Sequence, residues 1–200
     1  AWLLRRDGLA TWLDNRRDLG PVYLGRDFTA TVDAALAGIP NVKRTDEAPV
    51  AGAVQRLEAG QLGAIYTGRM EYGPRALGNR TILANPARRD THDLLNQRLS
   101  RSEFMPFAPV ATAERAAAVF DITNVNRRAC RYMTIATDVR PDWRKRIAAV
   151  VHVDQSARPQ VIERADNPLY HDILTAFESA TGLAALVNTS FNVHEEPIVN

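Results

Sequence analysis

The chain has 200 residues, of which 46% are hydrophobic and 24% charged, and its formal net charge is +2. This composition is typical of a globular protein and excludes disorder along the whole chain. So small a net charge argues against a nucleic-acid partner, because nonspecific affinity for nucleic acid depends on many phosphate contacts. Lys43 and Lys145 are the only lysines. Any bound phosphate would therefore be held mainly by arginine guanidinium groups.

The lone cysteine, Cys130, excludes an internal disulfide and a cysteine-rich metal site, and it favours the reducing cytoplasm. No apolar run approaches the roughly 20 residues that span a bilayer, and the N-terminus lacks a signal-peptide pattern. We therefore expect no membrane partner. The chain begins without methionine and ends directly after an apolar run, so we expect a fragment of a longer protein, cut at both ends.

The first 45 residues are the least regular part of the chain. They combine charged pairs and turn signals with a short helix predicted over 29–37, which indicates a linker and a docking helix. A stronger helix is predicted over 49–59, with proline in its first turn and Gly60 as its stop. A strand over 63–67 follows it.

The sequence GRMEYGPRALGNR, which we call the arginine segment (residues 68–80), comes directly after that strand. It contains three glycines and three arginines, Arg69, Arg75 and Arg80. Glycine lets the backbone approach a ligand, and arginine offers a fork of donors that matches phosphate or carboxylate oxygens. The segment is typical of an anion cradle; the alternative is a solvated surface turn.

The remaining elements alternate between strands and helices without a fixed repeat. This alternation predicts an α/β domain with a mixed sheet. Strands are predicted over 81–84, 107–111, 132–137, 148–153 and 184–187, and helices over 90–98, 113–120 and 168–181, the last closed by Gly182.

Three further segments place polar residues where an apolar strand ends, which is where open α/β sheets bind ligands. They are RLSRSEFMPFAP (98–109), HVDQSARPQ (152–160) and NTSFN (188–192). NTSFN is equally typical of a turn that caps its own backbone. His152 and Asp154 could suggest a metal pair, but no third ligand lies near them in the sequence, which favours a structural histidine and no metal site.

The chain has no Walker loop, GxGxxG, HExxH or GxSxG motif, which disfavours the common nucleotide-binding and hydrolase folds. What remains is an arginine-lined site with serine and asparagine at a strand end. Such a site is able to hold a triphosphate or an acyl phosphate without a covalent nucleophile.

In their order and spacing, the strings GRMEYGPRALGNR, EFMPFAP, HVDQSARPQ and NTSFNVHEEPIV resemble the C-terminal half of O-carbamoyltransferases of the NodU, TobZ and CmcH type. The resemblance implies a YrdC-like fold over 46–200, a twisted mixed β-sheet with flanking helices and a concave basic face. It implies that this domain converts carbamoyl phosphate and ATP, with Mg²⁺, into carbamoyl adenylate. An N-terminal actin-like ATPase-fold domain would pass the carbamoyl group to an acceptor hydroxyl, and residues 1–45 would be the linker from it.

The resemblance also assigns roles to residues. It implies that Arg75, Arg158 and Ser190 contact the phosphates or the carbamoyl group. It assigns nucleotide or substrate binding, as a second set, to the following residues: Arg80, Arg101, Asn188, Asn192 and His152.

The chain departs from the family pattern at one cation. YrdC-like sites carry a lysine one or two residues before the position of Arg101, where this chain has Leu99 and Ser100. Two alternatives therefore stay open beside the enzyme: a YrdC-like module that binds a nucleotide or double-stranded RNA without chemistry, and a paralogue that has become a structural scaffold.

Overall fold

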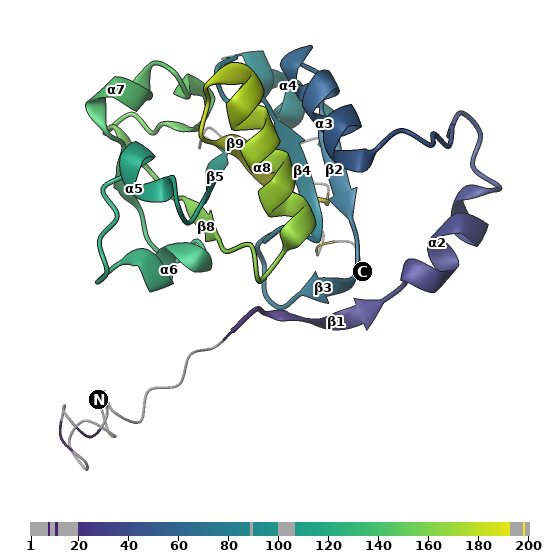
Figure 1. Cartoon of the computed structure of the whole chain (residues 1–200), viewed down its shortest axis with the longest axis horizontal. Helices are drawn as coiled ribbons and strands as arrows, with labels where there is room; N and C mark the ends of the chain where they lie inside the picture. Colours follow the sequence, from purple (N-terminus) through teal and green to yellow (C-terminus); the bar gives the residue numbers. More distant parts are fainter. Residues whose placement is uncertain are drawn as a thin grey trace.

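In the computed structural model the described residues are 8, 11, 20–88, 90–99, 107–192 and 198 (Figure 1). The centre is a five-stranded mixed sheet in the order β2-β4-β9-β5-β8. Only β5 and β8 run parallel; the other neighbours are antiparallel. The strands are β2 (Gly63–Tyr66), β4 (Arg80–Ala84), β5 (Ala108–Thr112), β8 (Gln160–Ile162) and β9 (Leu186–Ser190).

Helices α3 (Pro49–Glu58) and α8 (Pro168–Thr181) pack together on one face of the sheet. The bounds of α8 are those predicted, because its end signals are strong. Asn167 caps it by accepting the Tyr170 N–H at 3.0 Å, Pro168 starts it, and Gly182 ends it in the left-handed conformation at φ 74°. The predicted strands at β2 and β4 and the predicted helices at α3 and α4 (Asp90–Arg98) are also confirmed.

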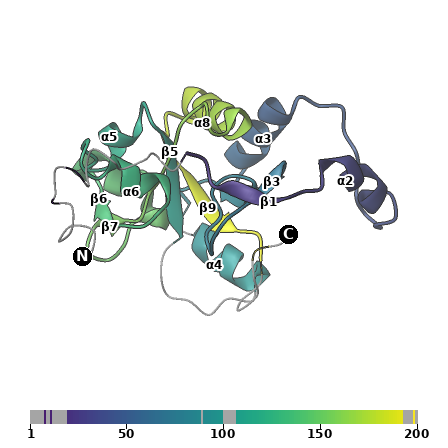
Figure 2. The ribbon, with the colours of Figure 1, turned by 90° about the horizontal axis from the view of Figure 1, so that it is seen from below.

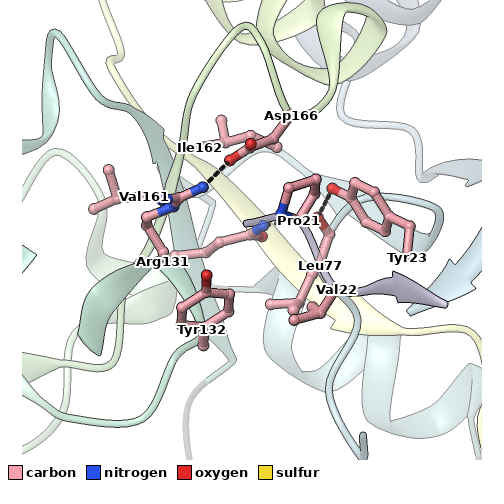
Figure 3. Close-up of a pocket in the computed structure, with 10 residues that line it drawn as sticks. Pro21, Val22, Tyr23, Leu77, Arg131, Tyr132, Val161, Ile162 and Asp166 are labelled. Carbon is pink, nitrogen blue, oxygen red and sulfur yellow. Dashed lines mark hydrogen bonds and ion pairs between the residues drawn. The ribbon is translucent and has the colours of Figure 1, made fainter. Parts of the chain in front are cut away.

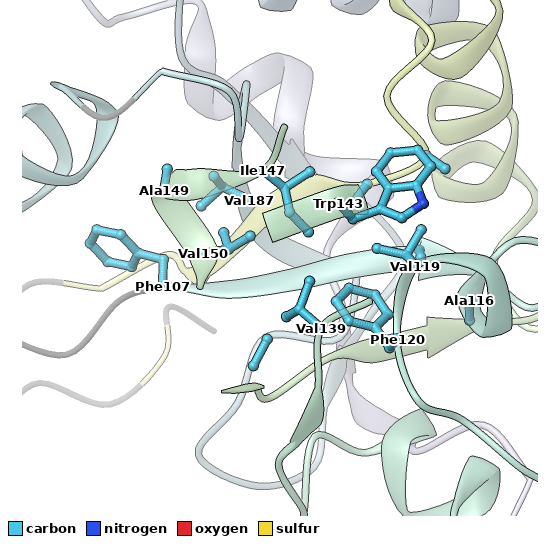
Figure 4. Close-up of a cluster of buried hydrophobic side chains, with 14 of the residues drawn as sticks. Phe107, Ala116, Val119, Phe120, Val139, Trp143, Ile147, Ala149, Val150 and Val187 are labelled. Atoms are coloured by element: carbon cyan, nitrogen blue, oxygen red, sulfur yellow. The ribbon is translucent and has the colours of Figure 1, made fainter. Parts of the chain in front are cut away.

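The opposite face of the sheet is covered by the largest hydrophobic cluster (Figure 4). Its centre includes Phe120, Trp143, Ile147, Val150 and the β9 residue Val187. Figure 2 shows α4 on the side of the sheet away from α3 and α8. Short helical elements contribute the rest of this layer: α5 (Ala116–Val119), α6 (Arg127–Arg131), α7 (Pro141–Arg144) and the 3₁₀ helix η1 (Ala148–Val150).

Two predicted strands are wrong. Residues 148–150 form η1, in which Val150 N–H bonds to the Ile147 carbonyl, so this apolar run is buried by packing and not by a sheet. Within 132–137 only Thr137 joins a strand, β6 (Thr137–Asp138), which pairs with β7 (Ser156–Ala157). The chain before it is bent back by hydrogen bonds to the end of the unpredicted helix α6, and Met133 has φ 54°. The predicted helix over 113–120 is confirmed only as α5.

The early part of the chain holds a strand that the sequence did not indicate. β1 (Tyr23–Asp27) pairs antiparallel with β3 (Arg69–Glu71) of the arginine segment. The following helix α2 (Thr29–Leu36) has the predicted position and no buried residues, and Figure 1 shows it extending away from the body. Its docking role and the boundary at 45 stay predictions. Among the described helices none is long and apolar enough to cross a bilayer.

Candidate functional site

The sheet brings the ends of four strands to one edge. In the register, Thr81 lies opposite Ser190, Ala108 opposite Asn188, and Val110 beside Gln160. The start of β4, the end of β9 and the starts of β5 and β8 are therefore neighbours at the same edge. The arginine, HVDQSARPQ and NTSFN segments meet there, with the described end of the 98–109 segment, as predicted from their positions at strand ends.

The backbone amides of the arginine segment point at a carboxylate of the chain itself. Glu71 Oε1 accepts the N–H groups of Leu77, Asn79 and Arg80 at 2.7, 2.7 and 3.0 Å. Glu71 is fully buried, and its Oε2 has no hydrogen-bond partner among the residues described. The segment is an anion cradle in its backbone, but Glu71 fills that cradle. An external anion would therefore be bound by side chains and not by these three amides.

Two carbonyl groups of the same segment are held by the other segments. Asn188 Nδ2 donates to the Ala76 carbonyl at 2.9 Å, and Gln160 Nε2 donates to the Leu77 carbonyl at 2.8 Å. The two side chains are linked, because Asn188 Nδ2 also donates to Gln160 Oε1 at 2.8 Å. Asn188 is 1% exposed. The Asn188 side chain is thus bonded to the protein itself and supports the backbone of the arginine segment. Its predicted contact with a ligand stays a prediction.

Arg80 is also buried beneath the surface of the site. Its Nη1 donates to the carbonyls of Thr67 and Asn79 at 2.8 and 2.9 Å, and its Nη2 donates to the Gly68 carbonyl at 3.2 Å. The guanidinium lies 3.8 Å from the centre of the Tyr66 ring. These contacts tie the two ends of the arginine segment together and give Arg80 a structural role in addition to any electrostatic one.

Arg75 differs from its two companions in the segment. Arg69 Nε donates to the Gly25 carbonyl at 2.9 Å, and Arg80 is occupied as described. Arg75 is half-buried and forms no hydrogen bond or ion pair within the described part of the chain. Its guanidinium is thus the cation of this segment with its donors available to a ligand.

The HVDQSARPQ segment forms a tight turn with Asp154 as its cap. Asp154 Oδ1 accepts the N–H and the hydroxyl of Ser156 at 3.0 and 2.7 Å, and His152 Nδ1 lies 3.0 Å from the Ser156 hydroxyl oxygen. Burial lowers the pKa of His152 below its ordinary value of 6.5; the Asp154 carboxylate opposes this and the charge of Arg158 adds to it. The lowered pKa favours the neutral form of His152, and the half-buried Arg158 lies near it.

The remaining predicted residues lie after β9 or outside the described residues. Ser190 ends β9 and Asn192 follows it, both half-buried, and the Phe191 N–H bonds to the Arg80 carbonyl at 3.1 Å. Arg101 lies outside the described residues. Within the part of the chain that the structure describes, no group of three His, Cys, Asp or Glu side chains could hold a metal ion.

The sequence did not single out Glu71 and Gln160. Both stand inside quoted segments. Gln160 left a signal in the sequence, since it is the polar residue that begins the otherwise apolar strand β8, whereas Glu71 lies in a three-residue strand next to Arg69 and left none. Their role depends on segments far along the chain, because Gln160 bonds to a carbonyl 83 residues earlier.

A groove of about 480 Å³ lies beside β2, the edge strand of the sheet, under α3. Most of its lining is apolar, and the Glu47–Arg56 ion pair of 2.8 Å stands at its polar side. It reaches the site edge only at Tyr66 and Thr67. The arginine segment, the site defined above, therefore lies outside this groove.

Relatives of this chain include proteins of known and unknown activity. The nodulation protein NolO of Bradyrhizobium diazoefficiens is 36% identical over 190 residues, covering 92% of this chain and 34% of NolO. The 3'-hydroxymethylcephem-O-carbamoyltransferase of Amycolatopsis lactamdurans is 38% identical over 144 residues, covering 72% and 26%. An uncharacterized protein of Methanocaldococcus jannaschii is 37% identical over 148 residues, covering 74% and 24%. The chain thus spans about a quarter to a third of these relatives.

The fold is shared with a solved structure, full-length HypF in its phosphate- and nucleotide-bound form. The similarity has a TM-score of 0.50 at 16% identity and covers 78% of this chain and 19% of HypF. HypF contains a YrdC-like domain, so the predicted fold, a YrdC-like mixed sheet with flanking helices, is confirmed. The concave basic face stays a prediction.

The family model for the carbamoyltransferase C-terminus matches residues 54–200. This range contains the arginine segment and all the strand ends that form the site edge. The chain therefore belongs to the carbamoyltransferase C-terminus family.

Proposed function

We propose that this domain binds ATP and carbamoyl phosphate and forms carbamoyl adenylate. The observation that carries the proposal is the meeting of three of the four quoted segments at one sheet edge. These segments contain the half-buried residues Arg75, Arg158, Ser190 and Asn192. Membership of a carbamoyltransferase family supports the carbamoyl group as the substrate part.

The proposed reaction needs cations more than it needs a base. Hydrolysis of carbamoyl phosphate gives carbamate and phosphate; a carbamate oxygen then attacks the α-phosphorus of ATP, and the bond to the leaving pyrophosphate breaks. Arg75 and Arg158 would bind the phosphate oxygens on which negative charge gathers, and the Ser190 hydroxyl would donate to one of them. Because carbamate is already an anion, no residue has to remove a proton from it.

Mg²⁺ is part of this proposal as an ion that the nucleotide carries. The described residues supply no cluster of carboxylates, so the phosphates of ATP and water would provide its ligands. When bound, Mg²⁺ neutralises phosphate charge, and the two arginines complete that neutralisation from the side of the protein.

The complete protein would contain further machinery. Because the chain spans only 24 to 34% of the relatives described above, we propose that an N-terminal actin-like ATPase-fold domain transfers the carbamoyl group to an acceptor hydroxyl. The cytoplasm, with its supply of ATP and carbamoyl phosphate, is the proposed setting.

Pyrophosphate release in the presence of ATP, Mg²⁺ and carbamoyl phosphate tests the proposal. We expect Arg75→Ala and Arg158→Ala each to lower the rate by about 100-fold, because each removes a cation aimed at developing charge. Arg164→Ala is the matched control, since Arg164 pairs with Asp172 on the exposed surface. Absence of pyrophosphate from the unchanged protein, with nucleotide affinity unaltered in both arginine variants, would contradict the proposal.

The second candidate is a YrdC-like module that binds a nucleotide or RNA without chemistry. Leu99 and Ser100, at the place of the family lysine, favour it. For an RNA ligand we expect affinity to fall steeply with salt, because each phosphate contact releases counterions. Titration of double-stranded RNA at two salt concentrations measures this slope, and a flat or undetectable response rejects RNA binding.

A further inference from the structure

Residues 20–27, which we call the strap, lie along the arginine segment. β1 pairs with β3, with Tyr23 opposite Glu71 and Asp27 opposite Arg69. The Tyr72 N–H donates to the Val22 carbonyl at 2.8 Å just beyond the paired strands. The strap precedes the range of the family model, which begins at residue 54. Part of the support of the site therefore comes from chain outside that range.

Tyr23 connects the strap to the centre of the site. Its hydroxyl donates to the Leu77 carbonyl at 3.0 Å, the same carbonyl that accepts from Gln160 Nε2. The Leu77 N–H donates in turn to Glu71 Oε1. Burial raises the pKa of Tyr23, and the charge of Glu71 raises it further. The hydroxyl consequently stays protonated and remains a donor throughout the neutral pH range.

The N-terminal end of the strap is fixed independently. The Tyr132 hydroxyl donates to the Gly20 carbonyl at 2.8 Å. Between this bond and the Tyr23 bond the strap covers a small cavity, seen in Figure 3 beside the Arg131–Asp166 ion pair of 2.8 Å. The cavity measures about 20 Å³, enough for a water molecule and far too small for a nucleotide. This cavity is therefore a small gap in the packing between the strap and the body, and it is not a substrate site.

We infer that the strap is part of the carbamoyltransferase site and that Tyr23 is a positioning residue. Leu77 lies two residues after Arg75, so fixing both polar groups of Leu77 limits the positions that the Arg75 guanidinium can reach. Three elements fix them: the strap through Tyr23, β8 through Gln160 and β3 through Glu71. The part of this inference that concerns ligand affinity rests on the proposed function; the part that concerns order in the arginine segment does not.

Hydrogen exchange in Tyr23→Phe tests the structural part. The variant keeps the ring and removes only the hydroxyl. We expect the amides of Leu77, Asn79 and Arg80 to exchange about fivefold faster, the effect of one lost hydrogen bond on local opening, while amides in α8 are unchanged. Thr31→Val is the matched control, because it removes an exposed hydroxyl that donates to the Phe28 carbonyl at 2.9 Å in α2, outside the strap and the arginine segment. Unchanged exchange in the segment, or equal acceleration in α8, would overturn the inference.

ATP affinity of the same variants tests the positioning part. We expect Tyr23→Phe to bind ATP about fivefold more weakly and Thr31→Val to bind as the unchanged protein does. Faster exchange with unaltered ATP affinity would mean that the strap orders the segment without positioning a binding residue, and Tyr23 would lose that role. If the unchanged protein binds no ATP, the proposed function and the positioning role fail together, and the exchange measurement still decides whether the strap orders the segment.

Discussion

Glu71 occupies the place that an anionic ligand would take in a loop of converging backbone amides. Arginines and glycines in the same stretch indicate a cradle for an external anion, and the sequence does not reveal that an internal carboxylate fills it. The three N–H groups meet at one oxygen, Oε1, because the chain turns after β3 and brings residues 77–80 next to the Glu71 side chain. Among the three arginines of the segment, Arg75 is the one whose guanidinium forms no hydrogen bond or ion pair with the described residues, and we therefore propose it as the cation for a ligand.

Replacing Glu71 by alanine should destabilise the domain strongly. The substitution leaves the buried N–H groups of Leu77, Asn79 and Arg80 without their acceptor, and each such loss costs about 1–3 kcal/mol. We expect the free energy of unfolding in urea to fall by at least about 3 kcal/mol. Glu58→Ala is the control, since Glu58 is exposed at the end of α3. A loss equal to that of the control would show that the three bonds contribute little.

At the scale of elements, the arginine segment packs against the first turn of α8. Asn167, which caps the helix, also donates from Nδ2 to Asn79 Oδ1 at 2.8 Å. Gly78 lies in this contact with φ 126°, a conformation that glycine adopts without strain. A Cβ atom there would come within 2.6 Å of the Tyr170 ring and 2.9 Å of Asn167 Nδ2. The glycine is therefore required by both backbone conformation and close packing.

Gly78→Ala and Gly73→Ala separate these two requirements. Gly73 has φ 108° but nothing within 4 Å of the added Cβ. We expect Gly73→Ala to cost about 1 kcal/mol from backbone strain, and Gly78→Ala to cost about 2 kcal/mol more, because α8 or the segment must move. Urea unfolding of both variants measures the difference. Equal losses would place the whole effect in the backbone and argue against tight packing on α8.

Elements with strong local signals were predicted well, and elements that depend on packing were not. The asparagine cap, the proline and the glycine at the ends of α8 allowed both of its bounds to be predicted without error. The apolar run over 148–153 was predicted as a strand, but a turn of 3₁₀ helix buries the same side chains in the large cluster. β1 was missed because its partner is the three-residue strand β3, more than 40 residues later. A short strand with a distant partner leaves little periodicity in the sequence.

For the molecule as a whole, the antiparallel order β4-β9-β5 brings the segments of the site together. These strands are far apart in the chain, yet the register sets Ser190 beside Thr81 and Asn188 beside Ala108. The strap lies within residues 1–45, which the sequence predicts to be a linker and docking segment, and it joins this assembly through β1 and Tyr23. Contacts across such distances are formed only when the sheet itself is formed.

The sequence alone determined the family, the class of fold and the segments that meet at the site, since these depend on residue types in a fixed order. Strand ends and polar side chains can be read locally. The tertiary structure decided what each residue of the arginine segment contacts: Glu71 fills the amide cradle, Arg80 is buried beneath it, and Arg75 forms no hydrogen bond with the described residues. These differences depend on which side-chain donors and acceptors stay without a partner once the hydrogen bonds within the protein have formed. That is a property of the folded chain.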